Sequence, residues 1–127
     1  MDNTTWTNAT PIQPDELPPG LTTYLAAHLA RDLDTATTFF DENSSVTDEG
    51  QTHVGPAAIR AWMSTAASEY TYTTALTGVG KLDDAHYDVL HRLEGDFPGG
   101  VADLHFRFTL RGDTRAGDAI ASLVIEP

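Results

Sequence analysis

The sequence from position 102 to 110 reads Ala-Asp-Leu-His-Phe-Arg-Phe-Thr-Leu. Apolar side chains occupy every second position from residue 104 onward, and polar ones lie between them. This period of two is typical of a β-strand, because successive side chains of a strand point to opposite faces of its sheet. The stretch therefore predicts a sheet with one buried face and one face toward solvent or a partner.

Outward from this stretch, alternation predicts three more strands, over residues 70–79, 85–94 and 119–125. Turn-forming residues separate the strands at 78–84, 95–100 and 112–117. Segment 95–100, Gly-Asp-Phe-Pro-Gly-Gly, joins two strands and opens no helix. It is therefore interpreted as a hairpin tip and not as a phosphate-binding loop.

The N-terminal half has the longer period of helices. Pro18 and Pro19 can open a first helix, whose face carries Leu21, Tyr24, Leu25, His28 and Leu29 at helical spacing. A short helix is predicted over residues 35–40, with N-cap candidates at 32–34. After a brief strand at 44–48, a third helix begins at Gly55-Pro56 and turns Ile59, Trp62, Met63 and Ala66 inward.

This order of elements predicts one α+β domain, in which three N-terminal helices pack on one face of a curved antiparallel sheet. The domain is assigned to residues 17–127. Residues 1–16 are rich in Thr, Asn and Pro without apolar periodicity, so they are expected to form a flexible N-terminal tail.

The charge of the chain excludes several kinds of partner. The 127 residues carry a formal net charge of −12, which repels phosphate backbones and anionic membrane surfaces, so neither nucleic acid nor a membrane is expected as a partner. There is no cysteine for disulfides or thiolate metal sites. The start of the sequence lacks a basic region followed by an apolar stretch, which indicates a cytoplasmic protein.

Several stretches resemble a known superfamily. Residues 24–36, 39–48 and 55–62 are similar to the start of nuclear transport factor 2-like proteins, which include ketosteroid isomerase and the SnoaL-like polyketide cyclases. Residues 95–99 and 104–108 resemble a frequent hairpin of SnoaL-like members. The resemblance implies a cone-shaped fold, the cystatin-like roll, with a hydrophobic cavity inside the cone and a homodimer formed through the outer surface of the sheet.

The same resemblance implies two catalytic residues. Asp48 falls where ketosteroid isomerase has its general base, and Tyr24 falls on its oxyanion-stabilising tyrosine. Such a pair suits proton transfer beside a carbonyl group, since the carboxylate takes the proton and the phenol donates to the oxygen that gains charge. The isomerase's second oxyanion donor aligns on Leu104, and Asp103 has the opposite parity, so that half of the oxyanion hole is missing. Alternatively, Asp48 ends a strand at a turn and Tyr24 is a core residue.

Six further residues are candidate ligand contacts. His28 lies one helical turn after Tyr24, and His91 falls in the inward stripe of its strand. The other four are apolar wall candidates, namely Trp62, Met63, Leu104 and Phe106. His105 alternates away from Phe106 and is expected on the outer face. No His pair has metal-ligand spacing and the acidic pairs are adjacent in sequence, so neither a metal nor a cofactor is expected.

Two functions remain open. The first is a cofactor-free isomerase or cyclase that acts by proton transfer on a small, apolar, carbonyl-bearing molecule. The second is a non-catalytic dimer that binds a small ligand or serves as a scaffold. A carboxyl group inside a sealed apolar cavity would favour the enzyme, whereas a solvent-exposed Asp48 or a cone filled by side chains would favour the scaffold.

Overall fold

The computed structural model describes residues 6–111 and 120–127, with only the backbone described for residues 7 and 66–69. Parts of the expected tail and turns lie outside this range, namely residues 1–5, the turn at 112–117 and the strand start at Ala119, as does the side chain of Ala66. The helices are two 3-10 turns, Trp6–Asn8 and Pro14–Glu16, and α1 (Pro19–Ala30), α2 (Leu33–Thr37) and α3 (Pro56–Glu69). The strands are β1 (Thr10–Pro11), β2 (Ser45–Asp48), β3 (Gln51–Val54), β4 (Tyr72–Asp83), β5 (His86–Gly95), β6 (Val101–Leu110) and β7 (Ile120–Glu126).

The described strands form one sheet in the order β1-β4-β5-β6-β7-β2-β3. The pairs are antiparallel except β2 and β7, which run parallel with Val46 opposite Leu123. The sheet is thus mixed where the sequence pattern indicates antiparallel pairing throughout. Local alternation does not encode the direction of a partner that is so distant along the chain.

Helix boundaries follow from local chemistry. Pro19 is the first residue of α1, as expected, because the first N–H of a helix has no partner within it. Asp32 caps α2 by accepting a hydrogen bond from the Thr35 backbone N–H at 3.2 Å. The second helix therefore starts earlier and ends earlier than predicted, and Phe39 and Phe40, which follow it, are buried.

The N-terminal segment and β4 differ from the sequence-based expectation. Residues 6–16, expected as part of a tail, contribute the two 3-10 turns and β1, which pairs with β4 at Thr10 and Lys81. β4 itself extends through residues that the sequence pattern assigns to a turn. A short edge strand containing Pro11 is consistent with the missing proline N–H, since an edge strand needs donors on one side only.

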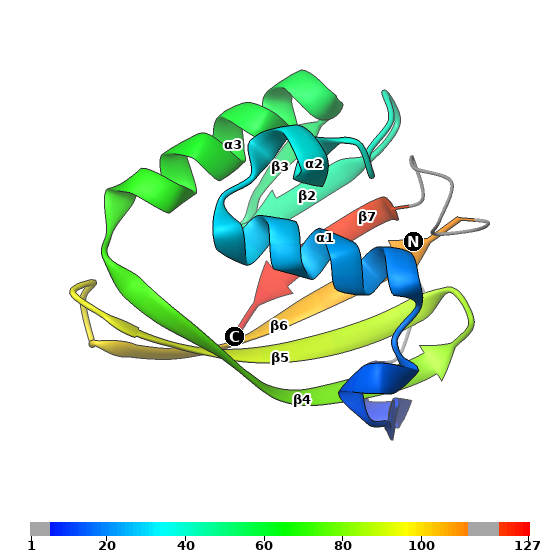
Figure 1. The fold of residues 1–127 in the computed structure, drawn as a ribbon. Helices are drawn as coiled ribbons and strands as arrows, with labels where there is room; N and C mark the ends of the chain where they lie inside the picture. The colour runs from blue at the N-terminus through cyan, green and yellow to red at the C-terminus, as the bar shows by residue number, and fades with distance from the viewer. Residues whose placement is uncertain (1–5, 112–119) are drawn as a thin grey trace.

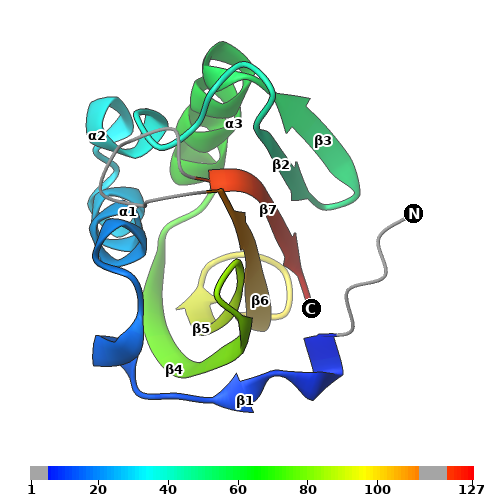
Figure 2. The same ribbon diagram turned by 90° about the vertical axis from the view of Figure 1, so that its right-hand side faces the viewer.

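The helices lie on the concave face of the curved sheet, and together they give the predicted cone (Figures 1 and 2). Register shifts in β4 and between Thr109 and Leu110 are the kind of irregularity that bends strands. Inward side chains from helices and strands form one core, whose fully enclosed members include Tyr24, Phe40, Ile59, Val89, Phe108 and Leu123. No helix among the described residues is long and apolar enough to cross a membrane.

Candidate functional site

A cavity of about 400 Å³ lies between the helices and the concave face of the sheet. Its wall is formed by His28 and Leu29 of α1, Arg31 just after α1, Met63 of α3, Tyr72 and Thr74 of β4, Leu93 of β5 and Phe106 of β6. Leu29 and Arg31 are exposed, so the cavity opens to solvent beside the end of α1. Its volume is within the range of roughly 300–1,000 Å³ that is usual for small-molecule pockets.

His28 is the histidine on the described cavity wall. Burial, reinforced by the nearby His91, lowers the pKa of His28 to about 4, so its imidazole is neutral at pH 7. Its Nδ1 lies 3.2 Å from the Tyr24 hydroxyl, one helical turn away. Its other nitrogen, Nε2, has no hydrogen-bond partner among the described residues.

Tyr24 fixes which nitrogen of His28 carries the proton. Burial raises the pKa of Tyr24 far above its usual value, so the phenol keeps its proton. The hydroxyl is fully buried, and its hydrogen bond with His28 Nδ1 satisfies the phenol proton when the phenol donates and Nδ1 accepts. A donating hydroxyl places the imidazole proton on Nε2. Tyr24 thereby makes His28 a neutral hydrogen-bond donor.

Tyr24 itself does not line the cavity. Its ring is enclosed edge-on by Phe39, Phe40 and Phe108, with centroid separations of 6.0, 5.4 and 5.8 Å. Such edge-to-face packing is typical of a core aromatic residue. The contact of the phenol with the cavity is therefore indirect and runs through His28.

Asp48 ends β2, immediately before the turn at Glu49 and Gly50, and is half-buried. Its Oδ2 accepts a hydrogen bond from Trp62 Nε1 at 3.0 Å. The Trp62 ring lies 5.9 Å from that of His28, measured between centroids. The phenol and the carboxylate thus belong to one chain of contacts, but His28 and Trp62 stand between them and neither end of the chain lines the cavity.

The cavity includes half of the predicted ligand contacts. His28, Met63 and Phe106 line it, whereas Trp62, His91 and Leu104 do not. His91 points inward as expected, with its ring 4.6 Å from that of Phe106, but it is only 1% exposed and its Nδ1 has no hydrogen-bond partner among the described residues. Burial lowers the pKa of His91 to about 4.

Five lining residues were not predicted as ligand contacts from the sequence, namely Leu29, Arg31, Tyr72, Thr74 and Leu93. The alternation of side chains along a strand could have predicted the strand residues. Tyr72 and Thr74 are two positions apart on β4, and Leu93 of β5 is paired with Thr74, so all three can face the same side of the sheet. Arg31 had no such signal. Among the residues that the structure describes, no group of three His, Asp or Glu is placed to hold a metal ion.

Comparison with solved structures identifies the fold. A candidate polyketide cyclase from Sinorhizobium meliloti is 28% identical over 91% of this chain and 100% of its own, with a TM-score of 0.78. A protein from Catenulispora acidiphila with a ketosteroid isomerase-like fold, in complex with trimethylamine, is 17% identical over 87% of this chain and 85% of its own, with a TM-score of 0.70. The chain therefore has the fold of the nuclear transport factor 2-like superfamily.

More distant superfamily members share the fold with little sequence similarity. A nuclear transport factor 2-like protein of unknown function from Cytophaga hutchinsonii is 11% identical over 84% of this chain and 85% of its own, with a TM-score of 0.62. Neither the protein-family models nor the sequences of curated proteins match the chain. The superfamily therefore accounts for the architecture, and the chemistry has to be argued from the residues of the site.

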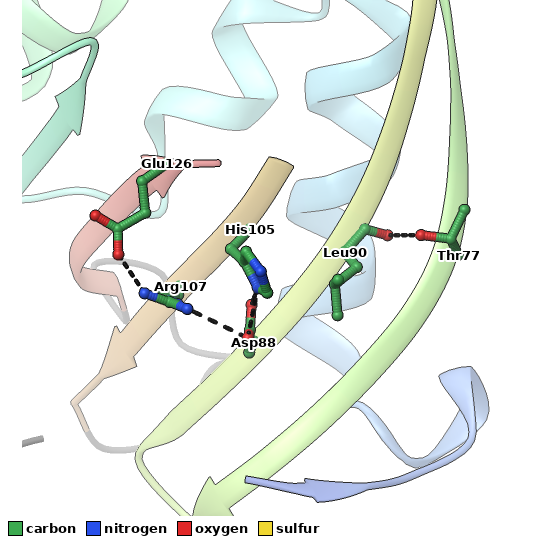
Figure 3. A network of polar contacts seen from close by, with 6 residues as sticks. All are labelled: Thr77, Asp88, Leu90, His105, Arg107 and Glu126. Carbon is green, nitrogen blue, oxygen red and sulfur yellow. Dashed lines mark hydrogen bonds and ion pairs between the residues drawn. The ribbon is translucent and has the colours of Figure 1, made fainter. Parts of the chain in front are cut away.

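A second polar cluster lies on the outer face of this nuclear transport factor 2-like sheet, turned away from the helices (Figure 3). Asp88 of β5 is only 6% exposed and accepts from His105 Nδ1 of β6 at 2.8 Å. Arg107 forms an ion pair with Asp88, Nε to Oδ2 at 3.7 Å, and a second one with Glu126 of β7. His105 therefore faces outward as expected, but it is paired with a buried carboxylate.

Proposed function

We propose that this protein binds a small apolar carbonyl compound in the cavity and acts on it, without a cofactor, as an isomerase- or cyclase-type enzyme. The observation that carries the proposal is the position of His28 on the cavity wall, with Nδ1 occupied by the Tyr24 hydroxyl. A neutral imidazole that presents Nε2–H can donate to a carbonyl oxygen as that oxygen gains negative charge. In this assignment Tyr24 is a positioning residue and His28 contacts the substrate.

The proposed proton acceptor is Asp48. Its Oδ2 is occupied by Trp62 Nε1, which leaves Oδ1 without a partner among the described residues. The Trp62 ring contacts His28, so the carboxylate and the imidazole are two contacts apart. A carboxylate that removes the proton beside the carbonyl, together with a donor on the oxygen, completes the exchange of a carbon-bound proton.

The test is proton exchange into a simple ketone, because it needs no knowledge of the natural substrate. We expect the protein to accelerate deuterium incorporation beside the carbonyl of 2-tetralone in D₂O, followed by NMR. Asp48→Asn should slow this exchange about 100-fold or more, since general-base catalysis contributes roughly 10²–10⁴-fold. The fold should survive, because an amide oxygen can still accept from Trp62 Nε1.

Two variants complete this test. Asp103→Asn removes an exposed carboxylate of the outer face and should leave the exchange rate unchanged. Tyr24→Phe should lower the rate without abolishing binding, because His28 loses its fixed tautomer. An exchange rate in Asp48→Asn equal to that of the original protein would remove Asp48 from the mechanism.

The second candidate is a dimeric binding protein or scaffold without chemistry. What favours it is that Asp48 does not line the cavity and already holds a hydrogen bond. The dimer would form through the outer face of the sheet, as the family resemblance implies. Ketone binding without catalysed exchange, together with a dimer mass in sedimentation velocity, would support this candidate over the enzyme.

A further inference from the structure

Arg31 is the one described cation without an acidic partner. The sequence has seven Lys and Arg residues, of which Arg115 lies outside the described range. Five of the remaining side chains form ion pairs, namely Arg60 with Asp34, Lys81 with Asp84, Arg92 with Asp103, Arg107 with Asp88 and Glu126, and Arg111 with Asp41. In a chain with a net charge of −12, an unpaired arginine on a cavity wall calls for an explanation.

The backbone at Arg31 is unfavourable for an arginine. Its φ of 59° and ψ of 33° are left-handed, and its N–H caps the carbonyls of Ala27 and His28. This position after a helix usually holds glycine, because a residue with a Cβ is destabilised there by roughly 1 kcal/mol. The backbone conformation alone would favour glycine at position 31. The presence of arginine there therefore points to a role for its side chain.

The side chain of Arg31 lies beside another residue of the cavity wall. Its Cζ lies 5.9 Å from the centroid of the Tyr72 ring of β4, which also lines the cavity. Cations near the C-terminal end of a helix can interact favourably with the helix dipole. The guanidinium of Arg31, however, makes no hydrogen bond to the last carbonyls of α1 among the described contacts, and its partner is an aromatic ring of the cavity wall.

The cavity combines this cation with an apolar interior. No carboxylate is among its described lining residues, and Leu29, Met63, Leu93 and Phe106 supply apolar surface. A planar guanidinium matches the two oxygens of a carboxylate. A phosphate dianion would meet a single arginine within a strongly negative protein, which is a poorer match in charge.

We propose that the ligand of this cavity is an apolar molecule that carries a carboxylate, which Arg31 binds at the mouth. The proposal rests on the proposed function, because it concerns the same cavity, and it adds the charge of the ligand. The apolar body lies against Leu93 and Phe106, and His28 Nε2–H remains available for a second oxygen. The negative field of the protein acts on every anion, but it is screened beyond about 8 Å at physiological salt, so Arg31 dominates at the mouth.

Shape-matched acids and amides test this proposal. Binding of 2-naphthoate and 2-naphthamide, and of octanoate and octanamide, is measured by isothermal titration calorimetry. Each acid should bind roughly five- to tenfold more tightly than its amide, since a charge-assisted hydrogen bond at an exposed site contributes at the lower end of its usual range. Arg31→Gln should abolish this preference and leave amide binding unchanged, and added salt should weaken the binding of the acids only.

Two variants separate recognition from folding and from general charge. Arg92→Gln removes an equal charge from the outer face and should keep the preference for acids. Arg31→Gly should be at least as stable in urea, because it relieves the left-handed backbone, and should also lose the preference.

The outcomes distinguish this inference from the proposed function. Equal binding of acid and amide by the original protein would overturn the inference and leave the cavity as a neutral-ligand site. Loss of amide binding in Arg31→Gln, or tighter binding of 2-naphthyl phosphate than of 2-naphthoate, would also overturn it. Absence of binding for every probe would instead overturn the proposed function.

Discussion

His91 and His105 lie on neighbouring strands of one sheet, point to opposite faces and are held in opposite ways. His91 is buried beside Phe106 with no acidic partner in the part of the chain that the structure describes, and burial lowers its pKa to about 4. His105 donates to the buried Asp88, which also pairs with Arg107. His91 is paired with Leu104, the residue before His105. Adjacent positions on a strand face opposite sides of the sheet, so His91 and His105 lie in opposite environments.

This difference divides the sheet into two kinds of surface. The concave face holds neutral imidazoles and aromatic rings around a cavity, where a donor can act on a ligand oxygen. The outer face places its charges in ion pairs between neighbouring strands. Chemistry is therefore expected on the concave face and cross-strand stabilisation on the outer one.

The largest expected effect tests the outer face. Asp88→Asn keeps the shape of the side chain but removes a buried charge that is shared by His105 and Arg107. We expect it to lower the free energy of unfolding by about 2–3 kcal/mol, because removing one partner of a buried ion pair leaves the other uncompensated. Urea unfolding at pH 7 measures this change.

Asp103→Asn is the matched control, since it breaks the exposed pair with Arg92 on the same two strands. Exposed ion pairs contribute only about 0–1 kcal/mol, so this variant should be nearly as stable as the original protein. Equal losses in the two variants would show that burial of Asp88 adds nothing, and the contrast between the faces would fail.

The next effect tests the concave face through pH. The unfolded chain binds protons at His28 and His91 near pH 6.5, whereas the folded protein binds them near pH 4. Their contribution to stability is therefore complete above about pH 6.5, declines as the pH falls toward 4 and levels off below that. His91 accounts for roughly 2–3 kcal/mol of that decline.

His91→Leu should remove the part of the pH-dependent loss of stability that His91 causes. At pH 7 it should raise the free energy of unfolding by about 1 kcal/mol, because the buried Nδ1 has no hydrogen-bond partner to lose within the described ranges. Between pH 6.5 and 4.5 the variant should lose less stability than the original protein, measured by urea unfolding at several pH values. An unchanged pH dependence would mean that His91 is not buried as a neutral side chain.

The sequence predicted the features whose signals are local. Alternation over residues 102–110 and the Gly-rich turn before it correspond to β6 and to its hairpin with β5. Helical spacing identified His28 and Met63 as inward residues, and both line the cavity. These predictions were possible because each depends on neighbours within a few positions along the chain.

The remaining features depend on distant contacts. The parallel pairing of β2 with β7 and the hydrogen bond from Trp62 to Asp48 join segments whose relation no periodicity describes. Arg31 was missed for a different reason. An arginine at the end of a helix is ordinarily explained by the helix dipole, and its left-handed backbone cannot be inferred from a residue type that seldom adopts it.

The smallest expected effect concerns the edge of the outer face. Trp6 lies against this face, with its ring 5.8 Å from that of His86 and 5.7 Å from Arg107 Cζ. Trp6→Ala should lower the free energy of unfolding by about 0.5–1 kcal/mol through the lost ring contacts. It should also make stability more sensitive to salt, because the uncovered Arg107 becomes more accessible to screening ions.

Trp6→Phe keeps a ring over the guanidinium and should retain most of the stability in urea unfolding at low and high salt. If Trp6→Ala matches the original protein in both measurements, the N-terminal segment does not shield the ion pairs, and their stability depends on the strands alone.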